Sequence, residues 1–221
     1  MNWLAAPSTS RTRIRGWLRF SLRMLFLLTL AVAVALGVMM KRLRDRKAAV
    51  VAINSAGGTM GLRIAGPKWL RTIINDDQCF YDPIRVSLGP IARQKGQDVP
   101  TLDDASLARL GGVLKSFKRL EVLDIRGSAV SDRSAAVLTS LETVAHLRIS
   151  DTQIANETIR EISRLRYLQS LELRGTAITD ECVDDLCGLG ALTSLDIAKT
   201  QISADGVSRL KQQLPSCKIT N

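Results

Sequence analysis

The sequence predicts an α/β protein: a short solenoid with parallel strands inside and helices outside, preceded by an N-terminal transmembrane helix. Aliphatic residues recur at a fixed step of 24 positions through the C-terminal half of the chain. A run of 17 residues without a charge, residues 24–40, lies near the N-terminus. Hydrophobic residues make up 46% of the chain but aromatic residues only 4%, which favours a core of layered aliphatic side chains.

The recurring positions define a strand. Its most regular column consists of Leu123, Leu147, Leu171 and Leu195. A second aliphatic residue follows two positions later in each copy, so both side chains point to the same side of an extended strand. One such strand cannot bury its apolar face alone, whereas copies stacked about 4.8 Å apart share a continuous core. The repeat therefore predicts a parallel sheet with one strand for each copy.

A turn and a helix are predicted after each strand. Hydroxyl side chains stand where the chain leaves the strand, and they can bond backbone groups that the strand ladder leaves unpaired. This hydroxyl column consists of Ser128, Thr152, Thr176 and Thr200. Apolar residues at three-residue steps then give each helix one buried face. The expected helix caps are Asp132, Asn156, Asp180 and Ser203.

The shared pattern, L-x-x-L-x-L-x-x-T-x-I, resembles the leucine-rich-repeat superfamily, in its class of roughly 24–26-residue repeats with T-x-I-T-D turns. The resemblance is close over residues 120–202 and looser over residues 84–221. The whole layout also resembles bacterial membrane-anchored repeat proteins of unknown role, which share a basic-flanked anchor, a Gly-Gly turn, a P-x-W-L segment and an L-P-x-C-x-I ending. The resemblance implies protein binding on the concave face of the solenoid.

The basic excess of the chain is concentrated around the apolar run. The formal net charge is +10 at pH 7. Residues 1–50 contain ten Lys or Arg and one Asp, a net charge of +9, whereas residues 51–221 contain 21 basic and 20 acidic residues, a net charge of +1. A nucleic-acid-binding protein would carry its basic patch on the folded domain, so no nucleic-acid partner is expected.

Residues 24–40 predict a single-pass anchor in a lipid bilayer. The run spans roughly 26 Å, against about 30 Å for a bilayer core. Basic residues follow it at once, which favours an uncleaved anchor over a cleaved signal peptide. Five basic residues stand on each side, so the positive-inside rule is tied, and only the short basic N-terminus favours an extracytoplasmic solenoid. Ala33 and Gly37 form a small-xxx-small pair that would permit weak self-association.

The sequence divides into five parts. These are a basic segment 1–23, the transmembrane helix 24–40, a basic juxtamembrane helix 41–54, an N-terminal cap 55–83, and the solenoid 84–221 with a loop inserted at 89–101. The cap is expected because a terminal repeat otherwise exposes its apolar edge. The alternative for this part is an interfacial helix that lays Trp69 on the membrane. The inserted loop is either a partner contact or a passive surface loop.

Strand alternation predicts which side chains lie on the concave face. The candidate partner-binding residues are Val122, Asp124, Arg126, His146, Arg148, Ser170, Glu172, Arg174, Ser194 and Asp196. The central column, Asp124, Arg148, Glu172 and Asp196, is expected to be exposed and to form an ionic ladder. This face is interpreted either as a solvated polar surface or as a recognition strip for a charged protein partner.

The sequence contains no catalytic motif. It lacks a G-x-S-x-G elbow, a P-loop, an H-E-x-x-H helix and a dinucleotide fingerprint, and its four cysteines match no zinc spacing. The lone histidine, His146, would support catalysis only if it lined a ligand-sized pocket. We therefore expect no enzyme and no cofactor. The predicted function is a membrane-anchored protein-interaction module, and the alternative is a structural component of the cell envelope without a specific partner.

Overall fold

The computed structural model describes residues 22–64, 68, 72, 81–90 and 101–221. The chain forms two compact units, residues 1–44 and residues 45–221, and each is considered by itself. The predicted basic segment, the predicted helix around Trp69 and most of the predicted inserted loop lie outside the described residues.

The first unit contains the beginning of helix α1, which runs without a break from Leu22 to Ser55. The predicted transmembrane and juxtamembrane segments are therefore parts of one helix. Large apolar side chains along its first half are exposed, Phe26 by 68% and Leu36 by 51%, so this half is not the buried core of a globular domain. Within the described part of the chain, this is one helix long and apolar enough to cross a membrane, and an N-terminal signal sequence would meet the same criteria.

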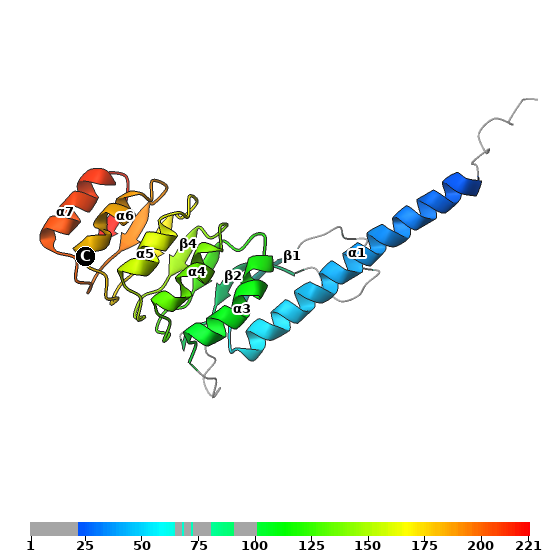
Figure 1. The fold of residues 1–221 in the computed structure, drawn as a ribbon, viewed down its shortest axis with the longest axis horizontal. Coiled ribbons are helices and arrows are strands. Elements are labelled where there is room, and N and C mark those ends of the chain that lie inside the picture. The colour runs from blue at the N-terminus through cyan, green and yellow to red at the C-terminus, as the bar shows by residue number, and fades with distance from the viewer. Residues whose placement is uncertain (1–21, 65–67, 69–71, 73–80, 91–100) are drawn as a thin grey trace, which may run out of the picture. The chain divides into compact units, whose positions relative to one another are not determined.

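The second unit is built on a seven-stranded sheet whose strands lie in chain order (Figure 1). The strands are β1 Thr59–Ile64, β2 Tyr81–Ser87, β3 Val122–Asp124, β4 His146–Arg148, β5 Ser170–Glu172, β6 Ser194–Asp196 and β7 Lys218–Thr220. β1 pairs with β2 in the antiparallel direction, and every later pair is parallel. The parallel strands confirm the α/β solenoid of the predicted fold class, because a 24-residue repeat returns each strand in the same direction.

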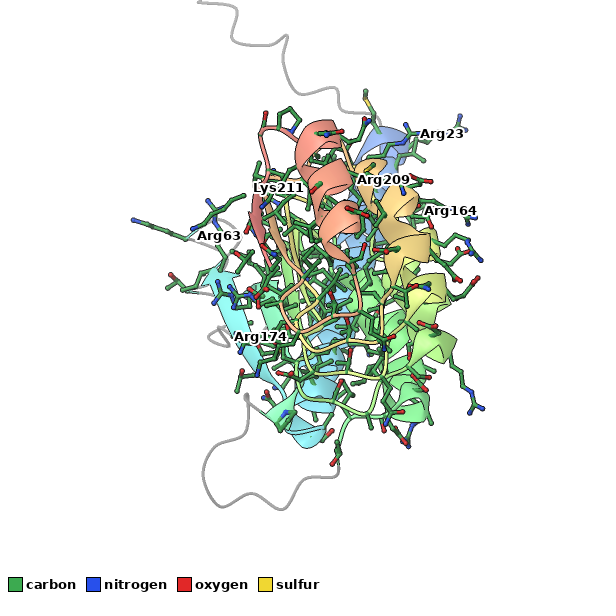
Figure 2. All side chains as sticks on the ribbon, turned by 90° about the vertical axis from the view of Figure 1, so that its left-hand side faces the viewer. Arg23, Arg63, Arg164, Arg174, Arg209 and Lys211 are labelled. Atoms are coloured by element: carbon green, nitrogen blue, oxygen red, sulfur yellow. The ribbon has the colours of Figure 1, made fainter. Side chains whose placement is uncertain are left out.

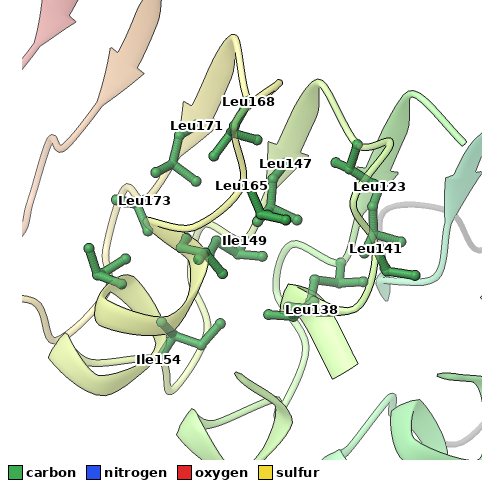
Figure 3. Close-up of a cluster of buried hydrophobic side chains, with 14 of the residues drawn as sticks. Leu123, Leu138, Leu141, Leu147, Ile149, Ile154, Leu165, Leu168, Leu171 and Leu173 are labelled. Atoms are coloured by element: carbon green, nitrogen blue, oxygen red, sulfur yellow. The ribbon is translucent and has the colours of Figure 1, made fainter. Parts of the chain in front are cut away.

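The register of the sheet is the register of the repeat. Each of the strands β2 to β7 contributes one side chain to a central aliphatic column that Figure 3 shows in part. The column consists of Val86, Leu123, Leu147, Leu171, Leu195 and Ile219. All but the partly buried Ile219 at the C-terminal end are buried.

Helices cover one face of this sheet (Figure 1). They are α3 Asp104–Ser116, the 3₁₀ turn η3 Asp132–Ser134 with α4 Ala135–Thr139, α5 Asn156–Ile162, the 3₁₀ turn η4 Asp180–Cys182 with α6 Val183–Cys187, and α7 Ala204–Gln213. Seen from the C-terminal end, helices and strands form two layers with the side chains of the core between them (Figure 2). The aliphatic layer is continuous through all copies, as expected for stacked repeats that cannot fold singly.

A left-handed turn ends each strand. The backbone has a positive φ at the same position in four successive copies: Gly127 (67°), Asp151 (54°), Gly175 (67°) and Lys199 (58°). Glycine adopts this conformation without steric cost, and a side chain at position 175 would also collide with the carboxylate of Asp151. The hydroxyl column then closes the turn: Thr152, Thr176 and Thr200 each donate to the carbonyl three residues earlier, at 2.6 to 2.7 Å.

The expected helix caps act between repeats rather than within them. Asp132 accepts hydrogen bonds from the backbone of Ala155 (2.9 Å) and Thr158 (3.2 Å) in the next copy. Asn156 does the same for Thr179 at 2.9 Å. The other members of this column are Asp104, which bonds to Ser131 and Ser134, and Asp180, which bonds to Ser203. Ser203 alone among the expected caps bonds within its own helix, to Gly206.

The N-terminal end of the core is covered by residues before and within the predicted cap. Ala49 and Ile53, near the end of α1, are buried in the same cluster as Val86 and Leu88. The chain then turns at Gly58, where a side chain would collide with Leu88. The last turns of α1 therefore also contribute to this cover.

Candidate functional site

The candidate site lies on the face of the sheet that points away from the helices, here called the sheet face. It is the face that strand alternation predicts to be concave. Figure 2 shows Arg174 leaving on this side, opposite Arg164 and Arg209 on the helix side. Because the strands are in register, side chains from successive copies stand in straight columns across the sheet face. One column carries Arg85, Val122, His146, Ser170, Ser194 and Lys218, and the next carries Ser87, Asp124, Arg148, Glu172, Asp196 and Thr220.

Four charged side chains form a connected tetrad at the centre of the sheet face. Arg126 binds Asp124 in a bidentate manner, with N···O distances of 2.9 and 2.7 Å. It also reaches Glu172 at 3.6 Å. Arg148 lies between the two carboxylates, 3.0 Å from Glu172 and 3.9 Å from Asp124. The tetrad has two positive and two negative charges, so it is neutral as a unit.

The tetrad buries part of the strip that the sequence predicts to be exposed. The side chain of Asp124 is only 8% exposed, and Val122 is 7% exposed. Burying a carboxylate is costly unless cations and donors compensate for lost water, and Arg126 supplies this compensation. The hydrogen bond to Asp124 raises the pKa of Arg126 above its ordinary value. Asp124 and Val122 are therefore buried, whereas strand alternation predicts that they are exposed.

One donor of the tetrad lacks a hydrogen bond. Nε of Arg148 is buried, and although it lies 3.0 Å from a Glu172 oxygen, this ion pair does not have hydrogen-bond geometry.

The predicted ionic ladder ends at Glu172. Its neighbour Asp196 has the same charge, and the carboxylate of Asp196 instead accepts a hydrogen bond from the backbone of Ala198 at 3.0 Å. The remaining expected residues, Ser170, Ser194 and Arg174, stand on the sheet face as half-buried or exposed side chains.

The sheet face is hollowed beside His146. A hollow of about 460 Å³ crosses strands β1 to β4, and the described residues that line it are Gly61, Leu62, Ile84, Arg85, Glu121, Val122, His146 and Arg148. Catalysis at His146 would require a ligand-sized pocket that also holds a nucleophile. This lining has one imidazole and one carboxylate but no hydroxyl or thiol nucleophile, and it offers groups for recognition rather than a nucleophile–base pair.

Two charged residues of this hollow, Arg85 and Glu121, are absent from the sequence-based candidates. Arg85 belongs to β2, whose irregular spacing from β3 hides its place in the 24-residue register. A step of 24 residues back from Val122 does not reach Arg85, because the segment between β2 and β3 contains an insertion. Only the pairing of Arg85 with Val122 brings the two together.

The cysteines are not arranged for redox or metal chemistry in the part of the chain that the structure describes. Burial raises the pKa of the Cys182 thiol to about 12, which removes the reactive thiolate at neutral pH. Cys187 and Cys217 are also free thiols. Among the described residues, no group of three His, Cys, Asp or Glu side chains could hold a metal ion.

Comparison with known proteins identifies the repeat. The family model described as Leucine Rich repeat matches residues 164–187 and 192–211. These two segments are leucine-rich repeats. The matched residues include β5, η4 with α6, β6 and most of α7. Leucine-rich-repeat domains commonly act as protein-interaction modules and are generally not enzymes. A comparison with curated protein sequences found no match.

Three solved structures are similar to this leucine-rich-repeat chain. An internalin from Listeria monocytogenes is 19% identical over 49% of this chain and 30% of its own, with a TM-score of 0.39. A leucine-rich-repeat protein from Leptospira interrogans is 20% identical over 49% and 33%, with a TM-score of 0.38. The actin-binding site 2 of leiomodin-1 is 16% identical over 69% and 90%, with a TM-score of 0.46. The chain spans only about a third of the two bacterial proteins, so nothing of their activity is transferred.

Proposed function

We propose that this protein is a membrane-anchored interaction module, in which α1 crosses a bilayer and the sheet face of the leucine-rich repeats binds another protein. The observation that carries the proposal is the charged tetrad, with Arg174 exposed beside it. A purely structural repeat needs its core columns and turns, but it has no need of ordered ion pairs across neighbouring strands on the solvent side.

The exposed apolar half of α1 supports the anchor. Leaving side chains such as Phe26 and Leu36 in water is unfavourable by roughly 1.5–3 kcal/mol each relative to burial. A bilayer removes this cost, and a helix satisfies its own backbone hydrogen bonds there. Ala33 and Gly37 lie on the same helix, and self-association through them stays a prediction.

The side of the membrane can be tested by thiol labelling in intact cells. Cys182 is unsuitable because it is fully buried, whereas Tyr167 is 69% exposed on the repeat domain. A Tyr167→Cys variant in a chain with its native cysteines replaced by serine is expected to react with a membrane-impermeant maleimide if the repeats are extracytoplasmic. Resistance to alkaline carbonate extraction checks insertion. Release of the chain by carbonate would refute the anchor.

Charge reversal on the sheet face tests the binding function. We expect Arg174→Glu to reduce photo-crosslinking of the full chain to a partner protein in native membranes by at least fivefold, because a rim charge of the proposed site is inverted. Arg164→Glu is the control, since Arg164 is also exposed and lies on the helix side (Figure 2). Equal loss in the two variants, or none in either, would contradict binding through the sheet face.

A further inference from the structure

The hollow beside His146 combines an apolar floor with charged walls. Its floor is formed by Leu62, Ile84 and Val122 from three neighbouring strands. Gly61 leaves the β1 side of the hollow open, because a side chain there would press on Cβ of Arg85 at 3.1 Å. The strand register shifts at this glycine, between positions 61 and 62. The volume of about 460 Å³ lies within the range of roughly 300–1,000 Å³ that is usual for ligand sites.

One cation of the hollow has unused capacity. No ion pair or hydrogen bond within the described residues engages the side chain of Arg85, which is exposed on β2. Arg148 is already held by the carboxylates of Glu172 and Asp124. A carboxylate on a bound molecule could therefore accept hydrogen bonds from Arg85.

The hollow favours a ligand with one negative charge over a ligand with two. Glu121 lies on the same lining, is exposed, and has no ion-pair partner among the described residues. It repels a second carboxylate and attracts donors such as peptide N–H groups. The lining as a whole is therefore complementary to a group that is apolar on one side and carries one negative charge on the other.

We propose that this hollow binds a short peptide segment of the partner protein, in which an aliphatic side chain is followed by one acidic residue. The inference rests on the proposed function and adds the chemistry of the partner. The aliphatic side chain packs on Leu62 and Ile84, the carboxylate pairs with Arg85, and the peptide backbone faces Glu121. An extended peptide suits the site because the hollow crosses several strands.

Fluorescence anisotropy with two labelled peptides tests the proposal on the full chain in detergent micelles. The probes are Gly-Ser-Leu-Asp-Ser-Gly and its neutral counterpart Gly-Ser-Leu-Asn-Ser-Gly. We expect the acidic peptide to bind about five- to tenfold more tightly, the effect of roughly one favourable charge pair. Arg85→Gln is expected to abolish this preference, and Arg164→Gln on the helix side is expected to leave it unchanged.

A second variant changes the affinity in the opposite direction. Glu121→Gln removes the repulsive carboxylate, so the acidic peptide is expected to bind about three- to fivefold more tightly than it binds the unmodified chain. Both Arg85 and Glu121 are exposed, so unchanged urea midpoints will show that the variants are folded.

Two results would overturn the peptide site. These are equal affinity for the two peptides, and weaker acidic-peptide binding by Glu121→Gln. If crosslinking still responds to Arg174→Glu in that case, only the peptide site is wrong and the proposed function stands. If crosslinking is also insensitive to Arg174→Glu, the proposed function fails with it.

Discussion

Asp132 joins two neighbouring repeats through hydrogen bonds. Its replacement by alanine tests how much these bonds contribute to the stability of the solenoid. Its Oδ1 accepts hydrogen bonds from N–H of Ala155 (2.9 Å), N–H of Thr158 (3.2 Å) and the hydroxyl of Thr158 (2.6 Å). Thr158 is fully buried. Truncation of Asp132 therefore leaves the first turn of α5 uncapped and a hydroxyl without its partner.

The expected cost follows from these contacts. Loss of a helix cap costs about 0.5–2 kcal/mol, and a buried hydroxyl left unsatisfied costs about 1–3 kcal/mol. We expect Asp132→Ala to lower the free energy of unfolding by about 3 kcal/mol, a large share of the roughly 5–15 kcal/mol of an ordinary domain. With a urea m value of about 2 kcal/mol/M, the unfolding midpoint falls by about 1.5 M.

Asp132→Asn is the matched control for this substitution. The next repeat uses Asn156 in the same role, with a 2.9 Å bond to Thr179, so an amide oxygen is sufficient. We expect this variant to lose less than about 1 kcal/mol, because the acceptor remains while its charge is lost. Adding Thr158→Val to Asp132→Ala removes the orphaned hydroxyl, and the double variant should lose less than the sum of the single ones.

Urea unfolding of the full chain in detergent, followed by circular dichroism, measures these differences. Amide hydrogen exchange locates them, and the amides of α5 should exchange fastest in the alanine variant. Equal losses for Asp132→Ala and Asp132→Asn would refute the reasoning, because the acceptor oxygen would then be irrelevant. So would a loss by alanine below about 0.5 kcal/mol, since the repeats would then be joined by apolar stacking alone.

Four further predictions concern single positions. Ser128→Thr should raise stability by about 1 kcal/mol in urea unfolding, because the Ser128 hydroxyl is buried without a partner while threonine hydroxyls bond in the other copies. Lys199→Gly should raise the free energy of unfolding by about 0.5–1 kcal/mol, because a positive φ strains any side chain. The gain is limited by the greater conformational entropy of glycine in the unfolded chain, and Lys199→Ala, which keeps the strain, should change nothing. Hydrogen bonds from Ser203 lower the pKa of Asp180 below its ordinary 3.8. The stability that this carboxylate provides is therefore present above about pH 4 and lost as the pH falls below it. On acidification, the urea midpoint of Asp180→Asn should fall less than that of the unmodified chain. With a pKa of about 12, Cys182 should escape iodoacetamide at pH 8 until urea unfolds the chain, whereas mass spectrometry should show that the partly exposed Cys187 and Cys217 react before it.

The sequence by itself determined the repeating layer. A side chain at a strict 24-residue step meets the same position of the next copy, so the leucine column, the hydroxyl column and the parallel strands follow from spacing and hydropathy. The antiparallel pairing of β1 with β2 lies outside this repeat and is not readable from its spacing. Local periodicity is sufficient wherever each contact repeats a previous one.

The tertiary structure decided what depends on contacts between different copies. Asp132 caps the helix of the next repeat, a choice that its own neighbours in sequence do not reveal. Asp124 is buried because Arg126 and Arg148 lie over it, whereas alternation alone makes it exposed. Arg85 joins His146 in one hollow although 61 positions separate them, since an insertion breaks the register between β2 and β3. Contacts between side chains of different repeats depend on the distances and charges that the folded sheet brings together.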